Sequence, residues 1–135
     1  FDQKIALSHG DDFCTDDLEY VKFKKEVRSL PWQQNFLIQP LQDRRDIASN
    51  MRDMSQSHNN NKATSIMDVA PKSIQEFFIE HQIDLLIHGH THRPNTHEVI
   101  VPNIHGVRIV LGDWHETGWC LTLEDQERRL EEFKL

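Results

Sequence analysis

Long apolar segments are absent from this sequence of 135 residues, although 37% of them are hydrophobic. A helix that crosses a membrane needs about 20 consecutive apolar residues, and no run here approaches that length. The pattern of a secretory signal peptide is missing as well. We therefore expect a cytosolic protein without a membrane span, and the length alone permits one domain.

Cysteine is scarce, and positive charge is in deficit. Cys14 and Cys120 lie far apart and form no Cys-x-x-Cys pair, which predicts two buried thiols in a reducing compartment rather than a disulfide framework. The net charge of -7 argues against nonspecific binding to nucleic acid, which depends on Lys and Arg contacts to phosphates.

Histidine, in contrast, is concentrated where a short apolar strand ends. Residues 84–92 read Asp-Leu-Leu-Ile-His-Gly-His-Thr-His. In an extended segment residues two apart point the same way, so either His90 with His92 or His88 with His90 could converge on one face. Gly89 lets the backbone turn sharply, and neutral imidazole is a common metal ligand. A single histidine here would indicate only an exposed turn, whereas three predict a metal site.

A second strand near the start of the chain ends in the same way. Residues 5–8, Ile-Ala-Leu-Ser, read as a short core strand and are followed directly by His9-Gly10-Asp11. Because ligands in α/β proteins bind at the carboxyl ends of strands, we expect His9, His90 and His92 to meet at one edge of a sheet. Taken alone, His9 could instead hydrogen-bond a carbonyl at the end of its strand.

These two motifs together resemble the last two motifs of the calcineurin-like metallophosphoesterases, which hold two metal ions between stacked sheets. Segments 14–17, 63–69, 87–94 and 110–114 resemble one family of that superfamily more closely, the UDP-2,3-diacylglucosamine hydrolases. That resemblance implies a diphosphatase of lipid A biosynthesis. Its reaction converts UDP-2,3-diacylglucosamine to UMP and 2,3-diacylglucosamine 1-phosphate, or lipid X.

The resemblance also implies a fold and a division of the chain. The fold class is α/β, namely the C-terminal half of a four-layer αββα sandwich with an inserted helical cap. Residues 1–28 and 70–135 would form the core, and residues 29–69 the cap that binds lipid. The family's Asp-x-His, Gly-Asp and Gly-Asn motifs precede the first His-Gly-Asp, and no counterpart stands before His9. We therefore expect this chain alone to be inactive and its missing N-terminal half to be a partner.

Site residues follow from the resemblance position by position. His9 and His90 would bind one ion and His92 the other, while His90 would also act in catalysis by touching the substrate phosphate. The residues that would contact the glucosamine and phosphate of the lipid are Asp17, Ser55, Asn59, Lys62 and His90. The cofactor would be two Mn²⁺ in the complete enzyme, with zinc also compatible with the histidines of this chain. Asp17 could alternatively be a first-turn carboxylate interacting with a helix dipole.

The segment proposed as the cap is locally basic. Between positions 22 and 62 basic residues outnumber Glu26, Asp43, Asp46 and Asp53; they are Lys22, Lys24, Lys25, Arg28, Arg44, Arg45, Arg52 and Lys62. Apolar residues recur there at helical spacing: Trp32, Phe36, Leu37, Leu41, Ile47, Met51 and Met54. This mixture suits an anionic amphiphile or a membrane surface, although an ordinary helical hairpin would also carry it. The resemblance favours a peripheral protein on the cytoplasmic face of the bacterial inner membrane.

The remaining pattern predicts helices first and strands later. We expect a helix over 16–27 capped by Thr15, a flexible linker over 55–61, and an amphipathic helix from Pro71 to His81. Strands are predicted over 96–101, 107–111, 119–123 and 129–133, with turns at 105–106 and 125–126.

Three alternatives to the hydrolase remain open at this point. Another calcineurin-like phosphoesterase would share the histidine motifs. A catalytically inactive scaffold would have no reason to keep His9, His90 and His92 together. A small zinc module could use the three histidines with Asp11, and it would fold only with metal.

Overall fold

The computed structural model describes residues 3–61, 67–124 and 127–135, without the side chains of residues 56–61. The chain forms two compact units, Phe1–Cys14 with Val69–Leu135 and Thr15–Asp68. The first unit is α/β and the second is helical, so the first helix of the chain groups with the helices that follow it.

A mixed four-stranded sheet forms the centre of the first unit. Its order is β1 (Ile5–Ser8), β2 (Leu85–His88), β4 (Ile104–Val110) and β3 (Asn95–Val101). The first three strands run parallel, and β3 runs antiparallel to β4. The predicted turn at 105–106 is wrong, because β4 already begins at Ile104 and the hairpin turn is Pro102-Asn103. Asn103 has a φ of 63°, a left-handed conformation that Asn tolerates better than most residues.

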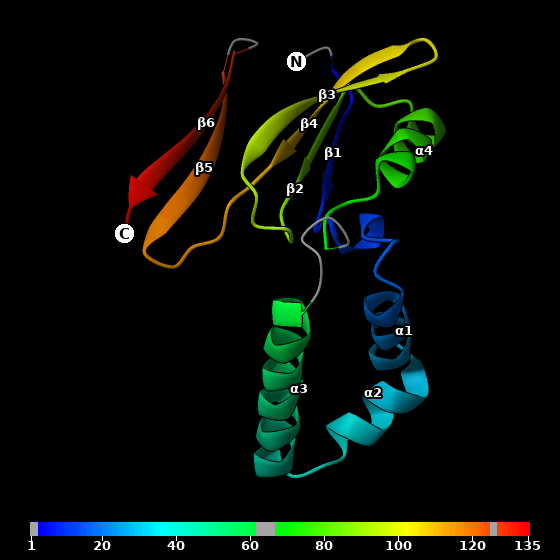
Figure 1. The fold of residues 1–135 in the computed structure, drawn as a ribbon, viewed down its shortest axis with the longest axis vertical. Coiled ribbons are helices and arrows are strands. Elements are labelled where there is room, and N and C mark those ends of the chain that lie inside the picture. The colour runs from blue at the N-terminus through cyan, green and yellow to red at the C-terminus, as the bar shows by residue number, and fades with distance from the viewer. Residues whose placement is uncertain (1–2, 62–66, 125–126) are drawn as a thin grey trace. The chain divides into compact units, whose positions relative to one another are not determined.

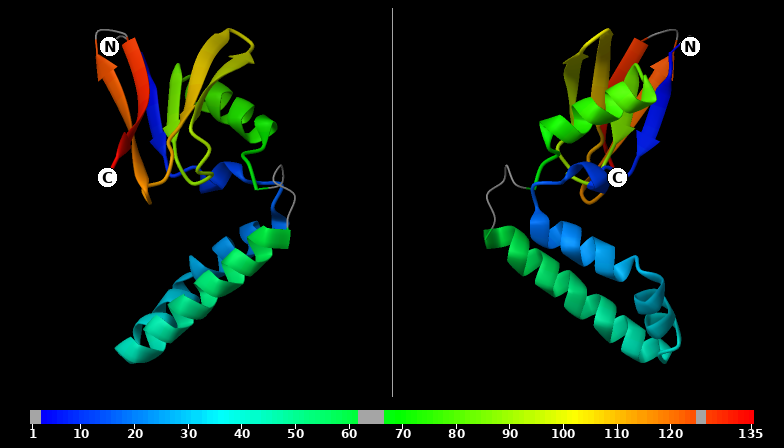
Figure 2. Two further views of the ribbon diagram at one scale, coloured as in Figure 1. Left: turned by 60° about the vertical axis from the view of Figure 1, so that its left-hand side comes forward. Right: turned by 90° about the vertical axis from the view of Figure 1, so that its right-hand side faces the viewer.

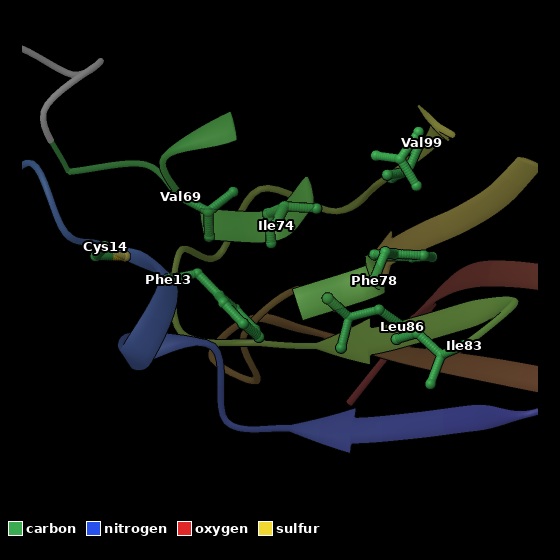
Figure 3. Packing of buried hydrophobic residues seen from close by; sticks show 9 residues of the cluster. Phe13, Cys14, Val69, Ile74, Phe78, Ile83, Leu86 and Val99 are labelled. Carbon is green, nitrogen blue, oxygen red and sulfur yellow. The ribbon is translucent and has the colours of Figure 1, made fainter. Parts of the chain in front are cut away.

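The two faces of this sheet are covered by different elements, as Figures 1 and 2 show. Helix α4 (Pro71–His81) lies on one face, and the antiparallel hairpin of β5 (Thr117–Glu124) and β6 (Glu127–Lys134) lies on the other. Successive side chains of β2 point to opposite faces. Leu86 therefore joins the cluster under α4 (Figure 3), and Leu85 and Ile87 pack with Leu121, Leu123 and Leu130 of the hairpin. The expected strands and the helix from Pro71 are confirmed; the predicted turn at 125–126 lies outside the described residues.

Phe78 is the central side chain of the cluster under α4. It is fully buried, and a Cβ built on Gly106 would lie 2.3 Å from its ring, so the ring packs directly on the backbone of β4. We expect Phe78→Ala to lower the free energy of unfolding by about 3 to 5 kcal/mol because it opens a cavity. Denaturant unfolding would measure this. Ile79→Ala, on the exposed side of α4, is the matched control and should cost far less.

The helical unit consists of α1 (Leu18–Val27), α2 (Leu30–Leu37) and α3 (Leu41–Asn61), and α3 runs back against the direction of the first two (Figure 2). The predicted cap Thr15 is wrong, because Asp17 caps α1 by accepting from the Tyr20 amide at 3.0 Å. The predicted linker over 55–61 is also wrong, since α3 continues to Asn61. That stretch is polar but has neither Gly nor Pro, and Asn only weakly disfavours a helix.

The two cysteines differ in burial. Cys14 is buried beneath α4, as expected, but Cys120 is exposed, so the prediction of two buried thiols is half wrong. Cys120 alternates with Leu121 along β5, and Leu121 takes the inward position. Among the residues that the structure describes, no helix is long and apolar enough to cross a membrane.

Candidate metal centre

The parallel strands bring three loops to one edge of the sheet. Ser8 pairs with His88, and His88 pairs with Val110, so β1, β2 and β4 end level with one another. The residues that follow these strands, beginning with His9, Gly89 and Leu111, therefore leave the sheet side by side. This edge is where ligands bind in open α/β sheets.

His9 and His90 come together at this edge, as predicted. Their ring centroids lie 4.9 Å apart, with the planes tilted by 58°. The Nδ1 of His9 lies 2.8 Å from Oδ1 of Asp11. Asp11 is almost fully buried, whereas 66% of the His9 side chain is exposed. Because a carboxylate only accepts, Nδ1–H of His9 donates to it, and Nε2 remains as the outward lone pair. A histidine that binds metal usually donates its other ring N–H to a carboxylate or carbonyl in this way, which fixes the orientation of the ring.

His92 takes a different position from the one its spacing suggested. His90 and His92 have φ values of 67° and 52°, and the Thr91 amide donates to the Gly89 carbonyl at 2.8 Å. The segment is therefore a tight turn, and the assumption of an extended segment is wrong. The Nδ1 of His92 lies 3.5 Å from Oδ2 of Asp113, which follows β4. His115 Nε2 approaches the same oxygen at 3.6 Å.

These residues fit part of a metal site. Within residues 3–61, 67–124 and 127–135, no three His, Cys, Asp or Glu side chains converge tightly enough to hold an ion. Asp11, which the zinc alternative would use as a ligand, accepts a hydrogen bond from Nδ1 of His9. In the same described part of the chain, Oγ1 of Thr91 is buried without a hydrogen-bond partner. A polar group from another part of the protein would find a hydrogen-bond partner in this hydroxyl.

Comparison with known proteins identifies relatives of this arrangement. The chain is 52% identical over 121 residues to the UDP-2,3-diacylglucosamine hydrolase of Cellvibrio japonicus, which covers 90% of this chain and 50% of the relative. It is 43% identical over 133 residues to the hydrolase of the same name from Chromohalobacter salexigens. The chain is therefore similar to UDP-2,3-diacylglucosamine hydrolases. It spans about half the length of the relatives that it matches. No protein-family model matches it.

The structure excludes one of the two histidine pairs that the sequence left open as a metal-binding pair, that of His88 with His90. His88 is 1% exposed, and both ring nitrogens are occupied. Arg108 Nη1 donates to Nε2 at 3.1 Å, and Nδ1 donates to the Gly89 carbonyl at 2.9 Å. His88 therefore belongs to the interior, and His90 is the residue that faces His9.

Apart from His90, the residues predicted to contact lipid fall within the segment Thr15–Asp68. Asp17 is buried and is the N-cap of α1. This position agrees with the alternative interpretation, in which its carboxylate interacts with the helix dipole. Ser55 is exposed on α3. Asn59 lies within α3, but its side chain is outside the description, and Lys62 lies outside the described residues. Their contacts with substrate stay predictions.

Two participants in the site were not assigned a role from the sequence. Asp113 approaches His92, and Arg108 holds His88. Asp113 carried a signal, because it follows β4, which was predicted as a strand and ends level with the histidine strands. Nothing in the sequence indicated Arg108. It is far from His88 along the chain, and the two residues come together because β2 pairs with β4.

Proposed function

We propose that the protein containing this chain hydrolyses the diphosphate of UDP-2,3-diacylglucosamine, releasing UMP and 2,3-diacylglucosamine 1-phosphate in lipid A biosynthesis. The observation that carries the proposal is the pair His9 and His90, with Asp11 behind it, in a chain whose relatives are named for this substrate. We use "full-length protein" for this chain together with the further region that those relatives contain.

His9, His90 and His92 would hold metal in the full-length protein, and we propose two Mn²⁺, with zinc as the competitor for imidazole ligands. Bound metal would supply an activated water and neutralise charge on the phosphoryl oxygens. The buried Asp11 accepts from Nδ1–H of His9, which leaves Nε2 as the nitrogen that would bind metal. His90 would additionally donate to a phosphate oxygen of the substrate.

The remaining ligands would come from the other half of the full-length protein. A two-metal site needs carboxylates to bridge the ions and offset their charge, and the described residues form no group of three His, Cys, Asp or Glu side chains that could hold an ion. The same half would complete the four-layer sandwich, of which this chain provides the mixed sheet, its helix and its hairpin.

The direct test is turnover by the purified full-length protein. With Mn²⁺ it should release UMP from UDP-2,3-diacylglucosamine, and a chelator should abolish that release. Cleavage of simple phosphodiesters without cleavage of this substrate would instead favour another calcineurin-like phosphoesterase. Metal binding without any hydrolysis would favour the noncatalytic module.

The helical unit would serve as the cap that binds the acyl chains and the membrane surface. Its described residues include large apolar side chains that are exposed: Leu18, Phe23, Leu30, Leu37, Ile38, Leu41 and Met54. Basic residues lie among them, including Lys22, Lys25 and Arg45. Such a surface matches an anionic amphiphile, and we propose peripheral binding at the cytoplasmic face of the inner membrane. The glucosamine and phosphate of the lipid substrate would be contacted by Asp17, Ser55, Asn59 and Lys62.

Leu37 and Ile38 offer the cleanest test of this cap. Both are more than half exposed, whereas Trp32 and Phe36 stack on each other at 5.0 Å and so also support the helix. We expect Leu37→Ser and Ile38→Ser each to weaken binding of the acylated substrate by roughly 1.5 to 3 kcal/mol. The KM of a deacylated analogue is the control and should not change.

Equal losses with both substrates would contradict the acyl-binding role. The replaced residues would then support only the helical unit itself. Gln39→Ser, next to Ile38 and without an apolar side chain, should leave both KM values unchanged.

A further inference from the structure

The side chain of His88 lies where the two histidine-bearing loops meet. We propose that His88 is a positioning residue: it fixes the separation of His9 and His90 and thereby sets the metal affinity of the centre. This inference rests on the proposed function, because it concerns the same site. It assigns a role to a buried histidine of the motif that the proposed ligand set does not include.

The loop after β1 rests directly on the His88 ring. Gly10 has a φ of 109°, and a Cβ built on it would lie 2.7 Å from Nδ1 of His88 and 2.9 Å from the carbonyl oxygen of Gly89. These separations are too short for any side chain, so the backbone that carries His9 is in contact with the imidazole. The Gly89 amide also donates to the His9 carbonyl at 3.1 Å. The two loops are thus joined beside His88.

Hydrogen bonds fix the ring from two sides. A guanidinium only donates, so Nε2 of His88 must accept from Arg108 Nη1, and the proton must be on Nδ1. Nδ1 then donates to the carbonyl of Gly89, the residue before His90. The edge of the Phe13 ring, 6.0 Å away between centroids, closes a third side.

These contacts link the sheet to both ligands. Arg108 belongs to β4, so its bond to His88 ties the ring to the central strands. The ring in turn determines where the backbone of Gly10 can rest and where the Gly89 carbonyl points. The nearby rings of His9 and His90, at 4.9 Å, follow from those two backbone positions. A ligand pair held at a fixed separation binds metal without first having to be ordered.

The chain offers a matched set of variants. His88→Leu removes both hydrogen bonds, and His88→Asn keeps a donor near the position of Nδ1 but no acceptor at the position of Nε2. Leu86→Ala is the control, because Leu86 lies two residues earlier on the same face of β2 and is equally buried. All three lower the thermal stability of the same core, but only the first two alter the contact between the loops.

The measurements are Mn²⁺ affinity by calorimetry and Tm, each on the full-length protein. We expect His88→Leu to weaken Mn²⁺ binding by roughly 10- to 100-fold, the range for residues that orient metal ligands. His88→Asn should fall between it and the wild type, and Leu86→Ala should lower Tm without weakening the metal affinity. If His88→Leu does not fold, His88→Asn against Leu86→Ala gives the same comparison.

The outcomes separate this inference from the proposed function. Wild-type affinity in His88→Asn and His88→Leu, while the wild type binds Mn²⁺ and releases UMP, would overturn the positioning role alone. An equal loss of affinity in Leu86→Ala would also overturn it, because general loosening of the core would then explain the effect. Absence of Mn²⁺ binding by the wild type would instead overturn the proposed metal centre.

Discussion

Replacing His90 with alanine in the full-length protein should reduce UMP release from UDP-2,3-diacylglucosamine by more than roughly 100-fold, since residues that only orient ligands already account for changes of about that size. The change removes a proposed ligand and a proposed phosphate contact together. His90 lies in the loop that follows β2, and the four residues of β2 itself are all buried. The thermal midpoint should therefore change little.

His105→Ala is the matched control for this replacement. His105 is also a histidine of the same unit, but it is exposed on β4, and its Nε2 lies 3.7 Å from Oε2 of Glu98. Its loss should leave turnover unchanged. Turnover near the wild-type rate in His90→Ala, with bound Mn²⁺ retained, would remove His90 from the centre.

The chain of 135 residues by itself should release no measurable UMP from UDP-2,3-diacylglucosamine in the presence of Mn²⁺. The physical reason is the ligand set: the described residues bring two imidazoles together but form no group of three His, Cys, Asp or Glu side chains that could hold an ion. Two neutral ligands cannot offset the charge of two divalent ions. The measurement is separation and quantification of UMP after long incubation.

The full-length protein assayed in parallel is the control for substrate and metal. Adding the rest of the full-length protein as a separate polypeptide should restore activity if the two parts associate. Sustained, metal-dependent UMP release by the chain alone would show that its own residues complete the centre, and the proposed contribution of the other half would be wrong.

Much of the fold was predictable because its signals are local. The apolar run before His88 and the spacing of Ile74, Phe77 and Phe78 each determine an element within a few residues, and β2 and α4 were located correctly. Errors arose where a pattern had two physical solutions. A polar stretch without Gly or Pro can be a loop or the end of a long helix, and α3 continues through it to Asn61.

The candidate site was predictable in part for the same reason. Strand ends reveal which histidines leave the sheet together, and His9 and His90 do meet. The backbone conformation of the histidine loop could not be predicted in this way, because the positive φ values of His90 and His92 depend on the packing of neighbouring loops. Contacts such as Arg108 with His88 depend on strand register, which spacing along the chain does not encode.

The outer strand β1 has a consequence for handling the chain in solution. Its four residues pair with β2 on one side, and within the described residues no strand pairs with the other side. Leu7, in the middle of β1, is 78% exposed. An open strand edge with an apolar side chain is a template for intermolecular pairing. We therefore expect this edge to promote self-association of the chain at high concentration, and repulsion from the net charge of -7 to oppose it.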